Sequence, residues 1–274
     1  DVTRTAFNPF DDGFWSGSFD GSDDRVTVVG GHNIGTGDFT ISAWVYRKSN
    51  GTYPVILDTR SSDGDTKPVI YTDGTTLYYY TAGGIRITAS SAINNGVWYF
   101  VRLVRSSGTT KLFLNGVQVG SDYSDSNNYA PTNDWEIGSR HTNQHYWYGY
   151  ISNFHFTLSA LSGTDVPTTP TSNTSNSAGN LLCLNTSNIT DKSFSKLKLI
   201  ETGANTRPVF PFANTTIPQQ TTSLSGLYRG SIRNVGFLDE SSNNTVISVS
   251  GTPTQGSFTP HYPPSGYWSV LFAS

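Results

Sequence analysis

The sequence contains an uninterrupted alternating run, Asp38-Phe39-Thr40-Ile41-Ser42-Ala43-Trp44-Val45-Tyr46. One face of this run is apolar and consists of Phe39, Ile41, Ala43 and Val45; the other face carries Thr40, Ser42, Trp44 and Tyr46. A period of two is typical of a β-strand that turns one face toward a core. Because the second face also carries two large aromatic side chains, the run predicts a strand that packs on both sides or borders a groove.

Short runs of the same kind lie on both sides of this strand. Residues 15–29 alternate about a glycine-rich turn, and we predict further strands at 54–58, 68–71, 76–80, 84–88, 97–105, 110–117, 135–139 and 150–156. The pairs Asp73-Gly74 and Ser107-Gly108 are typical of tight turns between neighbouring strands. No run keeps the period of a helix, so the sequence predicts an all-β chain with the strand spacing of a two-sheet sandwich.

The composition agrees with this interpretation. The chain has 27 Gly and 13 Pro among 274 residues, and its aromatic share of 13% supplies buried area that a hydrophobic content of only 35% does not. A net charge of −3 without a basic stripe argues against nucleic acid as a partner. No run resembles a membrane-spanning helix, so we expect no membrane insertion. Cys183 is the only cysteine, which excludes an internal disulfide.

One long segment suggests a domain boundary. Residues 162–180 are almost entirely Ser, Thr, Pro, Asn and Gly, which is typical of a loop or linker. We therefore predict a sandwich domain over residues 1–165, a linker over 166–180 and a second, smaller β module over 181–274.

Several short features recur near the ends of the chain. A hairpin pattern followed by a Phe-Pro step begins at Leu181 and again at Phe237, and Phe-x-Pro steps begin at Phe7 and Phe258. Recurrence of this kind favours tandem modules. The last predicted strand, around 268–272, either completes the small module or pairs with another chain by strand addition.

Four motifs stand in a fixed order along the first domain. They are Phe19-Asp20-Gly21-x-x-Asp24-x-Val26, then the strand that begins at Gly37, then Trp98-Tyr99-Phe100-Val101-Arg102 with Lys111–Val117, and finally Ile137-Gly138 with Tyr148–Phe154. Together they resemble the laminin-G-like, concanavalin A-like jelly rolls over residues 19–156. This resemblance implies a lectin-like jelly-roll sandwich and therefore a binding or display role.

The flanks of this region add a second resemblance. The Phe-x-Pro-Phe step at Phe7 and the Asp-x-Ser-Ser-Asn-Asn segment at Asp239 resemble tandem modules in structural proteins of marine phages, cyanophages in particular. This resemblance implies an extracellular virion protein: a tail fibre, a tail-associated protein or a capsid appendage. Its partners would be other virion proteins or copies of itself, and host-surface glycans would be its ligands. A purely structural virion subunit and an adhesin of a marine bacterium are the alternatives.

Glycoside hydrolases with related folds need paired carboxylates on one strand, and no such pair occurs in the sequence. Glutamate occurs only at Glu136, Glu201 and Glu240, which are far apart along the chain. We therefore expect no enzymatic activity.

A calcium site is predicted at one acidic turn. Asp20, Asp23 and Asp24 cluster beside Gly21, and Ca²⁺ prefers oxygen ligands of this kind. Asp and Asn also favour turns for purely conformational reasons, so solvated turn residues are the alternative. Weaker acidic loops lie at residues 63–65 and 122–128.

An aromatic-rich run before the last strand predicts a glycan-binding platform. Sugar rings pack their CH faces on aromatic rings, while Asn and His side chains bond to hydroxyls. The predicted platform consists of Tyr123, Tyr129, Trp135, His141, Asn143, His145, Tyr146 and Trp147. The alternative is that Trp147 and Tyr148 pack into the core or against a neighbouring subunit. The run Tyr78-Tyr79-Tyr80 alternates faces, so at least one of these rings points outward.

Overall fold

The computed structural model describes residues 15–130, 133–168, 181–185, 188–193, 195–207 and four short strands between residues 228 and 271. The chain divides into two compact units. The larger consists of Val2 and Asp12–Phe212, and the smaller of the remaining residues. The described residues form strands, turns and loops, and none of them belongs to a helix long and apolar enough to cross a bilayer.

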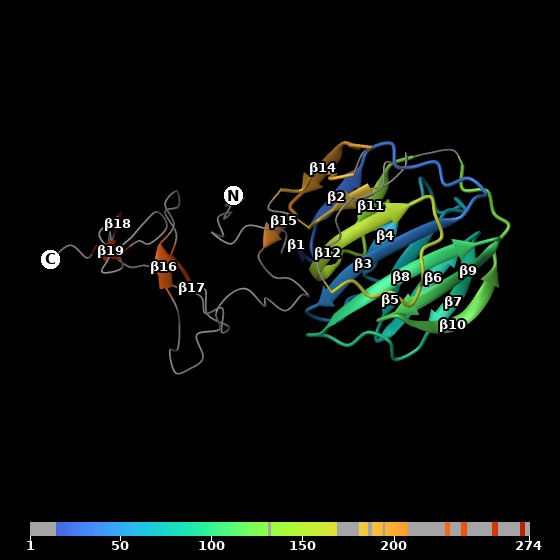
Figure 1. Ribbon diagram of the computed structural model, residues 1–274, viewed down its shortest axis with the longest axis horizontal. Helices are drawn as coiled ribbons and strands as arrows, with labels where there is room; N and C mark the ends of the chain where they lie inside the picture. The colour runs from blue at the N-terminus through green and yellow to red at the C-terminus, as the bar shows by residue number, and fades with distance from the viewer. Residues whose placement is uncertain are drawn as a thin grey trace. The chain divides into compact units, whose positions relative to one another are not determined.

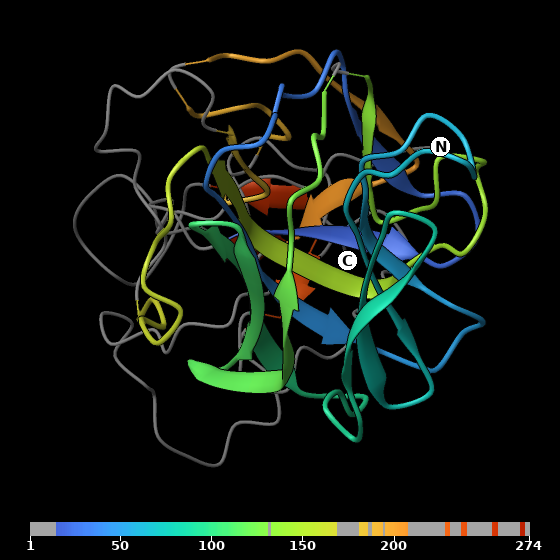
Figure 2. The same cartoon turned by 90° about the vertical axis from the view of Figure 1, so that its right-hand side faces the viewer.

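The larger unit is a sandwich of two antiparallel sheets (Figures 1 and 2). The first sheet has the order β10 (Val117–Ser124), β9 (Thr109–Leu114), β8 (Trp98–Ser106), β3 (Phe39–Arg47), β12 (Tyr148–Thr157), β1 (Ser16–Asp20) and β15 (Asn205–Arg207), with β13 (Leu181–Cys183) also paired to β12. The second sheet has the order β14 (Leu199–Thr202), β2 (Arg25–Val28), β11 (Trp135–Ile137), β4 (Val55–Asp58), β5 (Val69–Asp73), β6 (Thr76–Thr81) and β7 (Gly84–Ala89). The predicted all-β jelly-roll sandwich is thereby confirmed.

The central strand β3 behaves as its alternation predicts. Its apolar face is buried between the sheets, and Ile41 pairs with Leu103 of β8 on one side and with Phe156 of β12 on the other. On the outer face, Trp44 and Tyr46 are only partly buried. They contact other aromatic rings there, at 5.3 Å between Trp44 and Phe100 and 5.5 Å between Tyr46 and Trp98. The strand therefore packs on both sides.

Two predicted turns close hairpins in these sheets. Asp73 pairs with Thr76 across Gly74, whose φ is +55°, and Ser106 pairs with Thr109 across residues 107–108, which both have positive φ. The turn at residues 107–108 has two central residues of positive φ and the turn at residues 74–75 has one, and both arrangements match the right-handed twist of the flanking strands.

The structure differs from the predicted domain boundary. The segment from Leu181 onward, predicted to begin a separate module, instead contributes three strands to the sandwich: β13 pairs with β12, β14 with β2 and β15 with β1. Leu181, Cys183 and Leu184 are buried in the main core, where their apolar side chains complete the packing around β12. The composition of residues 162–180 is the same for a long loop within a domain as for a linker between domains. Residues 169–180 of that segment lie outside the described residues.

In the smaller unit the described residues form two hairpins. One joins β16 (Tyr228–Gly230) to β17 (Phe237–Asp239), and the other joins β18 (Thr254–Gly256) to β19 (Ser269–Leu271). The last strand thus pairs with a strand of its own chain, as in the first of the two alternatives. The Phe-x-Pro steps at Phe7 and Phe258 lie outside the described residues.

Candidate functional site

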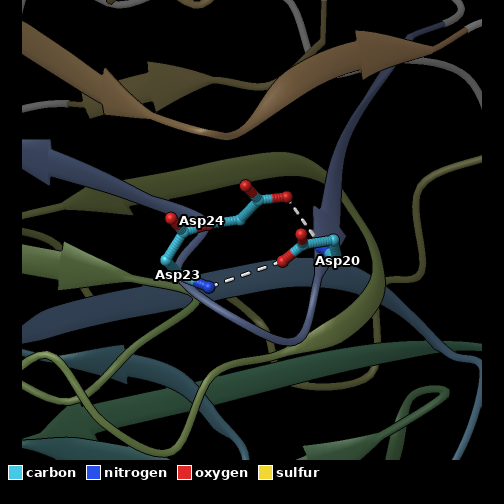
Figure 3. Close-up of side chains that lie close together, drawn as sticks. All are labelled: Asp20, Asp23 and Asp24. Atoms are coloured by element: carbon cyan, nitrogen blue, oxygen red, sulfur yellow. Dashed lines mark hydrogen bonds between the residues drawn. The ribbon is translucent and has the colours of Figure 1, made fainter. Parts of the chain in front are cut away.

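The predicted metal site is the turn between β1 and β2, shown in Figure 3. Since β1 belongs to the first sheet and β2 to the second, this turn crosses from one layer of the sandwich to the other at its edge. Gly21 adopts a φ of +81°, and the Asp20 carboxylate accepts a 2.7 Å hydrogen bond from the Ser22 N–H. The Asp24 carboxylate accepts one of 2.7 Å from the Asp20 N–H. These bonds turn the side chains of the loop toward one another.

Carboxylate oxygens of Asp20, Asp23 and Asp24 all lie within 4.8 Å of one another. Asp24 is buried, and Gly203 packs so closely on it that a Cβ at residue 203 would lie 1.9 Å from the Asp24 Oδ1. Burial raises the pKa of Asp24 to about 6, and the charges of Asp20 and Asp23 act in the same direction. The three carboxylates therefore repel one another when ionised, and a bound cation would reduce this repulsion. Because all of the potential ligand atoms are oxygens, the cluster fits Ca²⁺.

The other acidic loops are engaged differently. Asp122 pairs with Lys111 at 3.2 Å and Asp65 with Lys67 at 3.0 Å, while Asp125 is buried 3.6 Å from Arg105. Their carboxylates already face basic groups. Among the described residues, the β1–β2 turn is the one place where three acidic, His or Cys side chains come close enough to share an ion.

A depression of about 180 Å³ adjoins this turn and is here named the aspartate pocket. It is lined by Asp20, Gly21, Ser49, Asn50, Gly51, Pro54, Tyr146 and Tyr148. Asp20 from the predicted metal set and Tyr146 from the predicted platform thus meet in one hollow. Tyr148 is 40% exposed and offers a second ring at its wall. The pocket combines aromatic surface with carboxylate, amide and hydroxyl groups, which is the chemistry that sugars require.

Three predicted platform residues prove to be core residues. Tyr129, Trp135 and Trp147 are at most 1% exposed, so they cannot contact a glycan. The Trp147 Nε1 donates to the Tyr46 backbone oxygen at 3.3 Å, and the Tyr129 hydroxyl donates to the Asp125 carboxylate at 2.8 Å. In a chain with few large aliphatic side chains, these rings fill the space between the sheets.

The remaining predicted residues are dispersed. Tyr123 on β10 packs against the buried Tyr79 ring at 6.3 Å, and Asn143 is exposed in a turn with a φ of +56°. The His141 side chain is 9% exposed, and its Nδ1 lies 3.0 Å from the buried Asp58 carboxylate. His145 alone reaches a second hollow, described next.

This second hollow, here named the tyrosine groove, has a volume of about 230 Å³. It is lined by Tyr53, Val55, Arg60, Val69, Tyr71, Tyr80, Arg140 and His145. Except for His145, the sequence-based platform missed these residues. The sequence feature that could have identified them is the alternation along the two strands. It places Tyr71 of β5, and Tyr78 and Tyr80 of β6, on the face opposite the core residue Tyr79.

The sandwich of two antiparallel sheets defines a concanavalin A-like jelly roll. More specifically, the chain belongs to the concanavalin A-like lectin/glucanases superfamily, whose family model matches residues 20–167, more than half of the sequence. No protein with a curated description matches the sequence.

Two solved structures illustrate the shared fold. One is a protein of Bacteroides ovatus described as a candidate carbohydrate binding protein, with a TM-score of 0.57, 17% identity and 73% of this chain covered. The chain spans only 62% of the length of that protein. The other is the heptameric SAP-like pentraxin of Limulus polyphemus, with a TM-score of 0.51, 17% identity, and 75% of this chain and 99% of the pentraxin covered. At this identity the similarity concerns the fold.

Proposed function

We propose that this chain is a non-catalytic carbohydrate-binding module whose aspartate pocket holds a saccharide beside a Ca²⁺ ion. The observation that carries the proposal is that Asp20 belongs both to the carboxylate cluster and to the wall of the pocket. The description of the Bacteroides ovatus relative as a candidate carbohydrate binding protein supports it.

The pocket offers complementary groups for a sugar. The rings of Tyr146 and Tyr148 provide aromatic surface for CH faces, and the Ser49 hydroxyl and Asn50 amide provide hydrogen bonds to hydroxyls. Asp20, Asp23 and Asp24 would hold the cation. When bound, Ca²⁺ neutralises these carboxylates and attracts hydroxyl oxygens of the ligand.

We propose binding without hydrolysis, because the two neighbouring carboxylates on the central strands β4 and β11 of the second sheet are held by other side chains. Asp58 accepts hydrogen bonds from Arg60 Nη2 at 2.8 Å and Nε at 3.0 Å, and the His141 Nδ1 lies 3.0 Å away. Burial alone would raise the pKa of Asp58, but its bonds with Arg60 and His141 lower it instead. Glu136, its neighbour across the strands, is bound by the Thr27 hydroxyl, and burial raises its pKa. Neither carboxylate lines a hollow described above.

The test is a glycan array probed with the full chain in CaCl₂ and in EDTA. We expect binding that is lost in EDTA and in Asp20→Asn, and weakened about tenfold in Tyr146→Ala. Asp122→Asn is the matched control, since this exposed carboxylate pairs with Lys111 away from the pocket. The proposal is contradicted if the chain binds no glycan on the array, or if its binding is unchanged both in EDTA and in Asp20→Asn.

We further place this module outside the cell in a phage virion, where it would attach the particle to host-surface glycans alongside other virion proteins or copies of itself. The tandem sequence features at Phe7 and Phe258 and the low charge content of 14% support this placement. The alternative is a purely structural virion subunit that binds no glycan. Mass photometry separates the two: a trimer or hexamer that binds no glycan supports the alternative. A neighbouring capsid or tail gene supports the virion placement, whereas a secretion signal in the full gene contradicts it.

A further inference from the structure

The tyrosine groove has a wall of aromatic rings on the outer face of the second sheet. Tyr71 and Tyr78 are cross-strand partners on β5 and β6, with ring centroids 5.1 Å apart and planes 20° from parallel. The Tyr53 ring, 46% exposed, lies edge-on to Tyr71 at 6.1 Å. The His145 ring also lies edge-on to Tyr53, with ring centroids 5.7 Å apart. Continuous contact among these rings builds a surface suited to flat apolar faces.

The floor of the groove is polar and rigid. The Arg60 guanidinium lies 5.2 Å from the Tyr80 ring centroid and is forked onto the buried Asp58 carboxylate. Because that fork uses Nε and Nη2, the Nη1 group remains for a further acceptor. Arg140 contacts the exposed Asp63 carboxylate through its Nη2 group alone. Each guanidinium is thus matched by a carboxylate, and the groove carries hydrogen-bond donors without a net positive charge.

The chemistry of this lining selects a class of ligand. The aliphatic lining residues, Val55 and Val69, are at most 3% exposed, so the groove offers little to a lipid chain or an aliphatic side chain. Phenol rings with their hydroxyls and a fixed guanidinium complement a sugar ring, which has one apolar face and a rim of hydroxyls. The balanced charge favours neutral sugars over sulfated or carboxylated ones.

The groove and the aspartate pocket lie on two sides of one ridge. Along the chain, Tyr53 and Val55 line the groove while Pro54 between them lines the pocket, and His145 lines the groove while Tyr146 lines the pocket. The ridge is fixed by a 2.9 Å bond from the Val55 N–H to the His145 backbone oxygen. His145 Nδ1 also lies 2.8 Å from the Thr52 carbonyl oxygen. A chain of sugar units seated in one hollow would therefore meet the other across this ridge.

We infer that the tyrosine groove is a second saccharide subsite, and that the ligand is an extended neutral oligosaccharide rather than a single terminal sugar. This inference rests on the proposed function and specifies its ligand class. Tyr71 contributes ring surface in the groove, and Arg60 contributes a hydrogen bond to a hydroxyl.

Affinity electrophoresis of the full chain tests the inference with named polysaccharides. Neutral probes are laminarin, xyloglucan, hydroxyethylcellulose and dextran; anionic probes are hyaluronan, alginate and chondroitin sulfate. Retardation by a neutral probe is expected to weaken about tenfold in Tyr71→Ala and to persist in Tyr71→Phe, which keeps the ring. Tyr150→Ala is the matched control, because it removes a half-buried tyrosine from the outer face of the first sheet, outside both hollows. Oligosaccharides cut from the retained polymer should compete better as their length increases.

The outcomes separate the two proposals. Retardation that falls in Tyr146→Ala but not in Tyr71→Ala, with a monosaccharide competing as well as a longer oligomer, overturns the second subsite and leaves the proposed function intact. Retardation by anionic probes alone overturns the assignment to neutral sugars. Absence of retardation and of array binding contradicts the proposed function and the subsite together. A melting temperature of Tyr71→Ala within about 3 °C of the unsubstituted chain shows that the variant is folded.

Discussion

Replacement of Asp24 by Asn is expected to stabilise the metal-free protein and to abolish its stabilisation by calcium. Asn keeps an oxygen that accepts the 2.7 Å hydrogen bond from the Asp20 N–H, but it removes the buried charge. The pKa of Asp24 is raised on folding, so its favourable contribution is complete below its ordinary value of 3.8 and is lost as the pH rises through about 6. At pH 7.5 in EDTA, the ionised carboxylate therefore costs stability.

The magnitude follows from the same values. A rise from 3.8 to about 6 corresponds to about 3 kcal/mol without screening. Water at the edge of the sandwich reduces this to about 1–2 kcal/mol. For a unit of this size, such a gain raises Tm by about 2–8 °C. Calcium at a hundred times its Kd would stabilise the unsubstituted protein by about 2.7 kcal/mol, and Asp24→Asn by much less.

Differential scanning fluorimetry at pH 7.5 and pH 4, in CaCl₂ and in EDTA, measures both effects. We expect Asp24→Asn to melt higher in EDTA at pH 7.5, to match the unsubstituted chain near pH 4, and to respond little to calcium. Asp122→Asn, which alters an exposed carboxylate, is the control for a general charge effect. A lower Tm for Asp24→Asn in EDTA, or an advantage that does not shrink toward pH 4, would refute the electrostatic reasoning. An undiminished calcium response would refute the assignment of the ion to this turn.

Three further outcomes are expected. Gly149→Ala should lose at least about 3 kcal/mol of unfolding free energy in urea, or fail to fold. Its φ is +149°, and a Cβ at this residue would lie 1.9 Å from a backbone oxygen of β3. Gly37→Ala, which adds a Cβ in open space, should keep its unfolding free energy within about 1 kcal/mol of that of the unsubstituted chain. Asp125→Ala should cost about 3–5 kcal/mol in urea unfolding because it leaves the buried Arg105 guanidinium without its carboxylate; a loss below about 1 kcal/mol would contradict this. Burial lowers the pKa of His155 to about 4, so its imidazole ¹⁵N shifts should remain those of the neutral ring from pH 8 down to about pH 5, and charging above pH 6 would show that the ring is solvated.

Local periodicity was sufficient to predict the body of the fold. The alternation of residues 38–46 identifies β3 and its buried face, because successive side chains of a strand point to opposite faces and the apolar ones mark the buried face. The pairing of β14 with β2 could not be predicted in the same way. Leu199 pairs with Val28 across most of the chain, and a short strand of mixed polarity does not indicate its partner.

The candidate site was predictable where it depended on one turn. Asp20, Asp23 and Asp24 are adjacent in sequence, so their proximity needed no tertiary information. The aromatic platform depended on which rings face outward, and sequence composition cannot distinguish Trp147, which fills the core, from Tyr146, which lines the pocket. The tyrosine groove draws residues from loops and strands that only the folded sheet brings together.

The way the sandwich closes sets the order in which the chain can fold during its own synthesis. Strands β1 and β2 leave the ribosome before the other strands of the sandwich, yet β15 and β14, which cover one side of each, are completed only at Arg207 and Thr202. Until then both early strands present open hydrogen-bonding edges that can recruit strands of other nascent chains. A truncated chain that stops at residue 167, where the family match ends, would keep these edges permanently. We therefore expect a chain that extends through Arg207 to aggregate less than one that stops at residue 167.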